Sequence, residues 1–125
     1  MPSIDLLRND PKAQPFEAGQ TIFEAGASGD TMFIVVDGAV ELSLHGISLE
    51  TVESGGFFGE MALIDHRERS ASAIGKVSGK IVPIDQKRFL YLISNTPFFA
   101  VEVMKVMTDR LRRMNARVEA GNPAH

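Results

Sequence analysis

The segment Phe57–Ala73 contains the residues of this chain that are best suited to bind a phosphate group. Gly59 lets the backbone approach a ligand closely, and Glu60–Leu63 can form one helical turn. The free N–H groups and the dipole of such a turn both favour an anion. Arg69 adds a guanidinium group and Ser70 adds a hydroxyl group. Together these groups predict a small site for one phosphate.

Glu60 is unexpected in a phosphate site, because a carboxylate repels a neighbouring anion. It fits the site if it accepts a hydrogen bond from a sugar hydroxyl next to the phosphate. The alternative is a solvated ion pair between Glu60 and Arg69, which would contribute only about 0–1 kcal/mol and would need no ligand. The residue types therefore favour a sugar phosphate, with the ion pair as the structural alternative.

Short apolar strands surround this segment. Asp37-Gly38 is interpreted as a turn and His45-Gly46 as a hairpin tip. Turn signals recur every 8–12 residues, which predicts a mainly β fold: an antiparallel, jelly-roll-like β-roll of about eight strands over residues 16–84. The clearest predicted strands are 21–24, 31–36, 40–44, 47–52, 70–74 and 80–84.

Two helices are predicted after the roll, over residues 85–119. Asp85 is a candidate N-cap for a helix over 86–94, and Pro97 is expected to begin a longer one. Apolar residues recur along the second helix at spacings of three and four, which places them on one face. This stripe could pack on the chain's own core or form the seam of a homodimer. It consists of Met104, Met107, Leu111, Met114 and Val118.

Composition limits the function classes. The chain has 125 residues, 44% of them hydrophobic, and no cysteine, so we expect one domain over 1–125 without disulfides. No apolar run is long enough to span a membrane and no secretory signal begins the sequence, so we expect a cytoplasmic protein without direct membrane contact. Residues 1–100 carry 8 Lys and Arg against 13 Asp and Glu, which argues against nucleic acid as a partner.

An enzyme is not expected either. His45, His66 and His125 are far apart in the sequence and no His-x-His pair occurs, so a metal-dependent enzyme of the cupin type is only a third hypothesis. No serine has the sequence context of a catalytic nucleophile. We therefore predict no catalytic residues, no metal and no cofactor.

The segment Phe58-Gly-Glu-Met-Ala-Leu63, followed by Arg69-Ser-Ala-Ser72, resembles the phosphate-binding cassette of cyclic nucleotide-binding domains. These domains occur in catabolite activator-type transcription factors, in regulatory subunits of cyclic AMP-dependent kinase and in nucleotide-gated channels. The upstream glycines at 19, 26, 29 and 38 also match the family pattern, and the resemblance extends over residues 16–114.

The resemblance implies a role for each matching residue. Glu60 would bind the ribose 2′-hydroxyl and Arg69 the cyclic phosphate. The Ser70 hydroxyl and the N–H groups of Met61 and Ala62 would help to bind the phosphate, and Gly59 would keep the backbone close to the sugar. The wall of the pocket would be formed by Phe58, Leu63 and Ala71. Ile47 and Val52 are weaker candidates near the base. The helix after Pro97 would be a lid that moves when ligand binds.

Two positions depart from the family pattern. Glu68 stands where proline often precedes the arginine, and Met114 and Asn115 stand where some members contact the base. The choice between cyclic AMP and cyclic GMP stays open, although we favour cyclic AMP. The expected function is a non-catalytic cyclic nucleotide receptor that acts on an effector protein or an attached effector domain. The alternative is a ligand-free β-roll for dimerisation or docking, against which Gly59, Glu60, Arg69 and Ser70 together argue.

Overall fold

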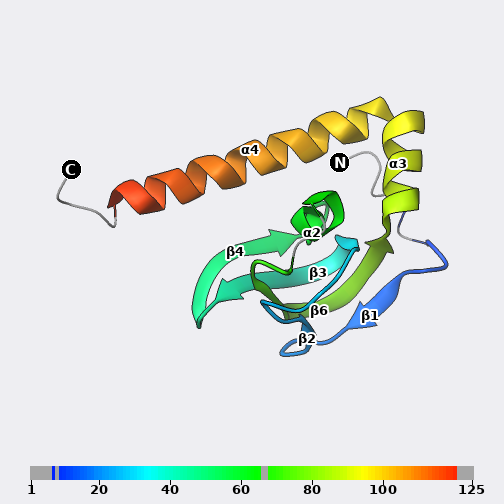
Figure 1. The fold of residues 1–125 in the computed structure, drawn as a ribbon. Coiled ribbons are helices and arrows are strands. Elements are labelled where there is room, and N and C mark those ends of the chain that lie inside the picture. Colours follow the sequence, from blue (N-terminus) through cyan, green and yellow to red (C-terminus); the bar gives the residue numbers. More distant parts are fainter. Residues whose placement is uncertain (1–6, 8, 66–67, 121–125) are drawn as a thin grey trace. The chain divides into compact units, whose positions relative to one another are not determined.

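Two long antiparallel strands, β3 (Met32–Leu44) and β6 (Ser72–Ile84), form the centre of the first part of the chain (Figure 1). They pair along nearly their whole length, from Met32 opposite Ile84 to Ser43 opposite Ser72. The structure, a computed structural model, describes residues 7, 9–65 and 68–120. Its two compact units are Met1–Phe89 and Leu90–His125.

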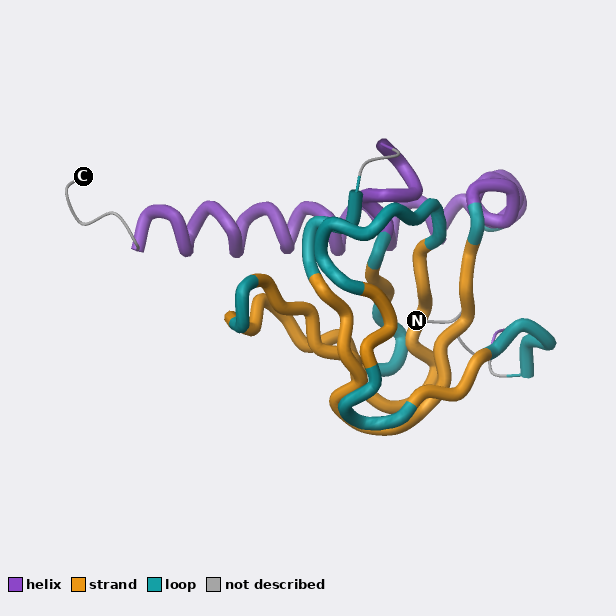
Figure 2. Tube along the Cα trace, turned by 60° about the horizontal axis from the view of Figure 1, so that its bottom comes forward, coloured by secondary structure: helices purple, strands orange, loops and turns teal. Residues whose placement is uncertain are grey.

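Four shorter strands complete the sheet around β3 and β6. Strand β4 (Ile47–Glu53) and strand β5 (Phe57–Phe58) pair with β3, whereas β1 (Gln14–Phe16) and β2 (Thr21–Phe23) pair with β6. Every pairing is antiparallel. Figure 2 shows these strands curving around one another. The prediction of a mainly antiparallel β-roll followed by helices is confirmed.

The described residues contain six strands rather than about eight, because two predicted turns are bends within long strands. Asp37 and Gly38 lie inside β3, where its register with β6 shifts, and residues 75–79 continue β6. A Cβ on Gly38 would overlap the backbone carbonyl groups of Val77 and Ser78. The glycine therefore allows close contact between two bent strands, a role that the sequence does not distinguish from a turn.

The hairpin between β3 and β4 matches its prediction. His45 and Gly46 have φ angles of 52° and 78°. A two-residue hairpin turn of type I′ requires positive φ at both of its central residues. Leu44 consequently lies opposite Ile47.

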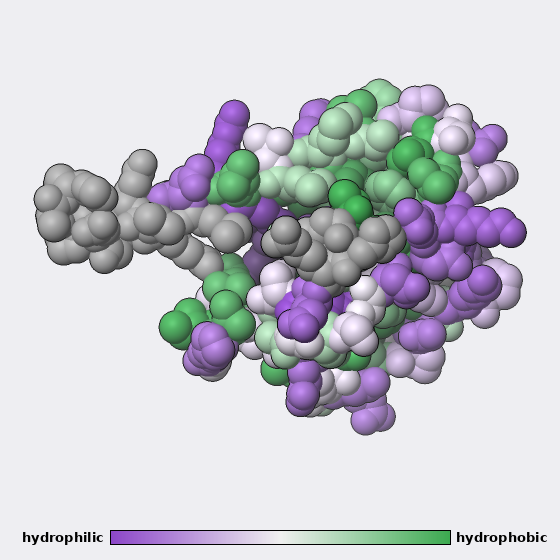
Figure 3. All heavy atoms as spheres, in the orientation of Figure 1, coloured by the Kyte–Doolittle hydropathy of each residue, from purple (hydrophilic) through white to green (hydrophobic). Residues whose placement is uncertain are grey.

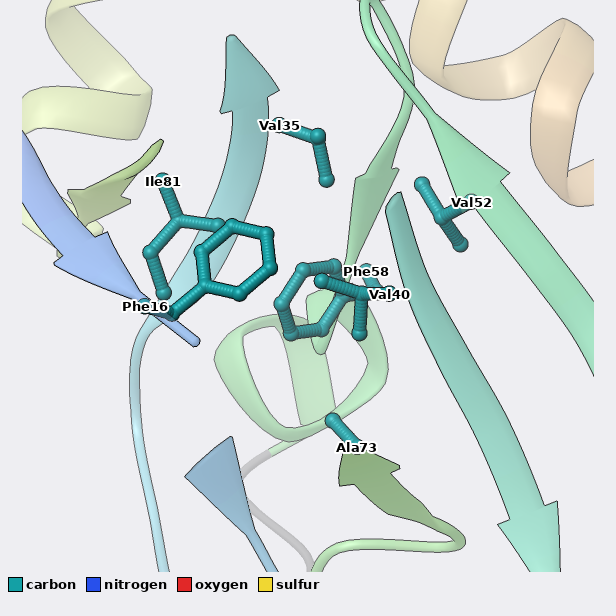
Figure 4. Packing of buried hydrophobic residues seen from close by; sticks show 7 residues of the cluster. All are labelled: Phe16, Val35, Val40, Val52, Phe58, Ala73 and Ile81. Atoms are coloured by element: carbon teal, nitrogen blue, oxygen red, sulfur yellow. The ribbon is translucent and has the colours of Figure 1, made fainter. Parts of the chain in front are cut away.

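A buried cluster holds the strands together. Figure 4 shows the rings of Phe16 and Phe58 with aliphatic side chains around them. The cluster comprises Phe16, Val35, Val40, Val52, Phe58, Ala73 and Ile81. Since Phe58 is anchored in this core, the chain that follows it starts from a fixed position.

Helix α3 (Gln86–Asn95) begins where the sequence predicts it. The Asp85 carboxylate accepts a hydrogen bond of 2.8 Å from the backbone N–H of Arg88, which confirms Asp85 as the N-cap. Pro97 begins α4 (Pro97–Ala120), also as predicted. Over the part of the chain that the structure describes, no helix is long and apolar enough to cross a membrane.

Candidate functional site

Arg69 is one of two buried charged residues in the described chain, and only 7% of its surface is exposed. Its backbone pairs with the loop that follows β2. The Arg69 N–H donates to the Ala27 carbonyl, and the Gly26 N–H donates to the Arg69 carbonyl, both at 2.8 Å. This two-way pairing fixes the backbone of Arg69 and directs its side chain inward.

The guanidinium group of Arg69 contacts an aromatic ring and a backbone carbonyl. Its central carbon is 4.2 Å from the centre of the Phe23 ring, and Nη1 donates to the Gly59 carbonyl at 3.1 Å. Nε is buried and has no acceptor among the described residues. An unpaired buried donor costs about 1–3 kcal/mol, so this atom is better satisfied when an anion approaches.

Burial lowers the pKa of Arg69, because desolvation disfavours its charged form. The charges of Asp30 and Glu60 act in the opposite direction. Arginine remains protonated at neutral pH even after such a shift. The site therefore holds a desolvated cation, which attracts an anion more strongly than an exposed arginine does.

Helix α2 (Glu60–Asp65) confirms the predicted helical turn after Gly59. Gly59 has a φ of 81°, a conformation that side chains disfavour, and the helix starts at the next residue. Glu60 is 5% exposed and interacts within the protein, so the simple solvated ion pair does not describe it. Ala62 and Leu63 are buried, whereas Met61 is 50% exposed.

The two ends of the predicted cassette lie close together. The exposed Ser70 hydroxyl donates to the sulfur of Met61 over 3.8 Å. Ala71 is half-buried beside it. The Ser72 hydroxyl accepts a hydrogen bond of 2.9 Å from the Ala25 N–H, which is a structural role.

Phe58 lies beneath the site rather than at its surface. It is fully buried, its ring stacks on Phe33 at 5.3 Å, and it lies 5.8 Å from Phe23. Ile47, a weaker candidate near the base, is 65% exposed at the hairpin, and Val52 is part of the core. The side chain of Met114 and residue His66 lie outside the described part of the chain.

Phe23 and Gly29 were not identified from the sequence as site residues. Phe23 contacts the Arg69 guanidinium group, and a Cβ on Gly29 would lie 2.6 Å from Nε and Nη2 of Arg69. Their sequence signals, an aromatic residue in a strand and a loop glycine, are too common to indicate this contact. Among the described residues, no three His, Asp or Glu side chains gather where they could hold a metal ion.

Residues 13–96 match the family model described as the cyclic nucleotide-binding domain. The chain belongs to this family. The matched region of this cyclic nucleotide-binding domain contains β1 to α3, and therefore Phe23, Glu60 and Arg69 as well. The resemblance inferred from the cassette is confirmed.

Known relatives agree with this assignment. The domain is 27% identical over 121 residues to a cyclic AMP receptor protein of Thermus thermophilus, covering 93% of this chain and 56% of the relative. It is 34% identical over 99 residues to a cyclic nucleotide-gated potassium channel of Mesorhizobium japonicum, covering 79% of this chain and 27% of the relative. The domain thus spans about half, or less, of the length of these relatives.

Solved structures share the fold. The Thermus thermophilus catabolite activator protein matches with a TM-score of 0.78 and 27% identity, over 95% of this chain and 58% of its own. A structure of cAMP-bound PfPKA-R matches with a TM-score of 0.72 and 27% identity, over 84% of this chain and 36% of its own. The β-roll of this cyclic nucleotide-binding domain is therefore the fold of its relatives.

Proposed function

We propose that this domain binds cyclic AMP, or cyclic GMP, as a non-catalytic regulatory receptor. The observation that carries the proposal is Arg69, a buried cation whose Nε lacks an acceptor among the described residues. A cyclic phosphate has one negative charge and two free oxygens, and these can accept hydrogen bonds from the N–H groups of an arginine guanidinium group. The cAMP-bound relative and the family match support the same ligand class.

Each cassette residue has a proposed role in this binding mode. Arg69 donates hydrogen bonds to the phosphate, and the Ser70 hydroxyl and the N–H groups of Met61 and Ala62 are further donors to it. The buried Glu60 carboxylate accepts a hydrogen bond from the ribose 2′-hydroxyl. The remaining proposed binding residues are Phe58, Gly59, Leu63 and Ala71. The Phe58 ring supports the site from below, consistent with its place in the core.

The proposal is tested by calorimetric titration of the purified domain with cyclic AMP and cyclic GMP. Adenosine and 5′-AMP serve as matched ligands that lack the phosphate or its ring. We expect heat and thermal stabilisation with a cyclic nucleotide only, since a ligand that binds the folded state raises its stability. Absence of both signals at millimolar cyclic nucleotide would refute the proposal and favour the ligand-free interaction module.

The output is proposed to be a movement of α4 that an effector protein, or an attached effector domain, detects. A ligand shifts such an equilibrium only through its different affinities for the two states. Spin labels on β4 and α4 test the movement, because their distance distribution should change when cyclic nucleotide is added. An unchanged distribution at saturating ligand would contradict this step without affecting the binding proposal. The two compact units are proposed to act together as one domain.

A homodimer through α4 is a separate proposal. Met104 and Leu111 of the predicted stripe are 57% and 58% exposed. Figure 3 also shows hydrophobic surface over the region of α3 and the start of α4. Light scattering should give a dimer mass for the wild type and a monomer mass for Leu111→Glu. A monomer mass for the wild type at the highest soluble concentration would contradict the dimer.

A further inference from the structure

Phe23 lies directly against the buried charge of the site. The central guanidinium carbon of Arg69 is 4.2 Å from the Phe23 ring centre and 5.9 Å from that of Phe33. Phe23 is in turn held by Phe33 and Phe58, with ring centres at 6.1 and 5.8 Å. A cation over an aromatic face is attracted to it, and the attraction grows when the charge is desolvated. The ring therefore restrains the position of the guanidinium group.

Gly29 limits the same group from another direction. A Cβ at this position would lie 2.6 Å from both Nε and Nη2 and 2.8 Å from the central carbon of Arg69. The φ angle of Gly29 lies outside the left-handed region, so its backbone conformation does not require glycine. What requires glycine is the space that the guanidinium group occupies.

We infer that Phe23 and Gly29 are positioning residues, which hold the guanidinium group of Arg69 in place for the oxyanion of the ligand. The Nη1 atom is already bonded to the Gly59 carbonyl. The buried Nε has no acceptor among the described residues, so it is a donor that a phosphate oxygen can satisfy. The inference rests on the proposed function and extends it to residues 40 or more positions before Arg69.

Positioning matters because arginine has a long and flexible side chain. Ordering such a side chain on binding costs about 0.5–1.5 kcal/mol, and a protein that orders it beforehand avoids this cost. Removal of the aromatic ring of Phe23 should therefore weaken cyclic nucleotide binding by about three- to tenfold. This is far less than the loss expected when Arg69 itself is removed.

The first experiment uses the domain freed of nucleotide, so that it does not depend on ligand binding. The Nε–Hε signal of Arg69 is recorded in a ¹H–¹⁵N spectrum and assigned with Arg69→Lys. We expect an upfield position caused by the Phe23 ring and slow solvent exchange caused by burial. Phe23→Leu and Gly29→Ala should both move this signal and speed its exchange, because one removes the ring and the other displaces the group.

Phe33→Leu is the matched control, since Phe33 belongs to the same aromatic cluster but lies farther from the guanidinium group. Gly29→Ala is expected to fold, because the atoms that must move are the end of a flexible side chain. An Arg69 signal that is unchanged in Phe23→Leu and Gly29→Ala, or changed equally in Phe33→Leu, would overturn the inference.

The second experiment is calorimetric titration of the same variants with cyclic AMP. Phe23→Leu and Gly29→Ala should bind more weakly than Phe33→Leu, at similar thermal stability. Equal affinity in all three variants would overturn the inference even if the wild type binds. A wild type that binds no cyclic nucleotide refutes the proposed function instead, and the spectrum of the free domain still decides whether Phe23 and Gly29 position Arg69.

Discussion

Replacing Arg69 with methionine should separate a ligand-binding arginine from a structural one. Methionine keeps much of the length of the side chain and removes its charge and donors. In the proposed complex, the loss includes charge-assisted hydrogen bonds from a desolvated group, worth about 2–5 kcal/mol together. The dissociation constant for cyclic AMP should therefore rise by about 30- to 5,000-fold.

The stability of the free domain should change much less. The variant loses the hydrogen bond to the Gly59 carbonyl, worth about 1 kcal/mol, and the contact with Phe23, worth about 0.5–2 kcal/mol. It also relieves the burial of Nε, which has no acceptor in the described part of the chain and whose burial costs about 1–3 kcal/mol. Since these contributions nearly cancel, the free energy of unfolding should stay within about 1 kcal/mol of the wild type.

Calorimetric titration measures the first quantity and denaturant unfolding of the nucleotide-free domain measures the second. A dissociation constant within threefold of the wild type would refute the proposed contact with phosphate. A loss of about 3–5 kcal/mol in stability would instead identify Arg69 as one partner of a structural buried pair. Either result would remove the reason for regarding its unpaired Nε as a ligand-binding atom.

Three further predictions follow from the same structure. Glu60→Gln should weaken the binding of cyclic AMP by about fivefold but that of 2′-deoxy cyclic AMP by less than about twofold, as calorimetric titration with both ligands would show. Equal losses of affinity for the two ligands would contradict a contact between Glu60 and the ribose hydroxyl. Gly38→Ala should lower the free energy of unfolding by about 3 kcal/mol or more in thermal melts, because its Cβ would meet the backbone of β6. Gly46→Ala is the control: Gly46 also has a positive φ but faces open space, so the loss should be only about 1–2 kcal/mol. The hydrogen bond from Arg88 lowers the pKa of Asp10, so this pair stabilises the fold above the ordinary aspartate pKa and loses its effect as pH falls through the lowered value. Asp10→Asn should accordingly be less stable than the wild type by about 1 kcal/mol at pH 7, and thermal melts should show this difference shrinking as pH falls below the ordinary aspartate pKa. A difference that does not change with pH would contradict the assignment.

Local patterns predicted much of this fold. The alternation of apolar residues, the His45-Gly46 turn and the Asp85 cap each act over a few residues, so the sequence is enough to identify them. The number of strands was not predictable in the same way. Gly38 supports a turn or a bend equally well, and its contact with the backbone of β6, about 40 residues away, decides between them.

The candidate phosphate site could be predicted from the sequence, because the order and spacing of Gly59, Glu60 and Arg69 are visible without a fold. The folded chain adds that Arg69 is buried, that its Nε has no acceptor among the described residues, and that Phe23 and Gly29 contact it. These features could not be predicted locally, because burial and close contact depend on segments that are distant in the chain. The loop after β2 reaches Arg69 only through the backbone pairing at Gly26 and Ala27, which no local pattern encodes.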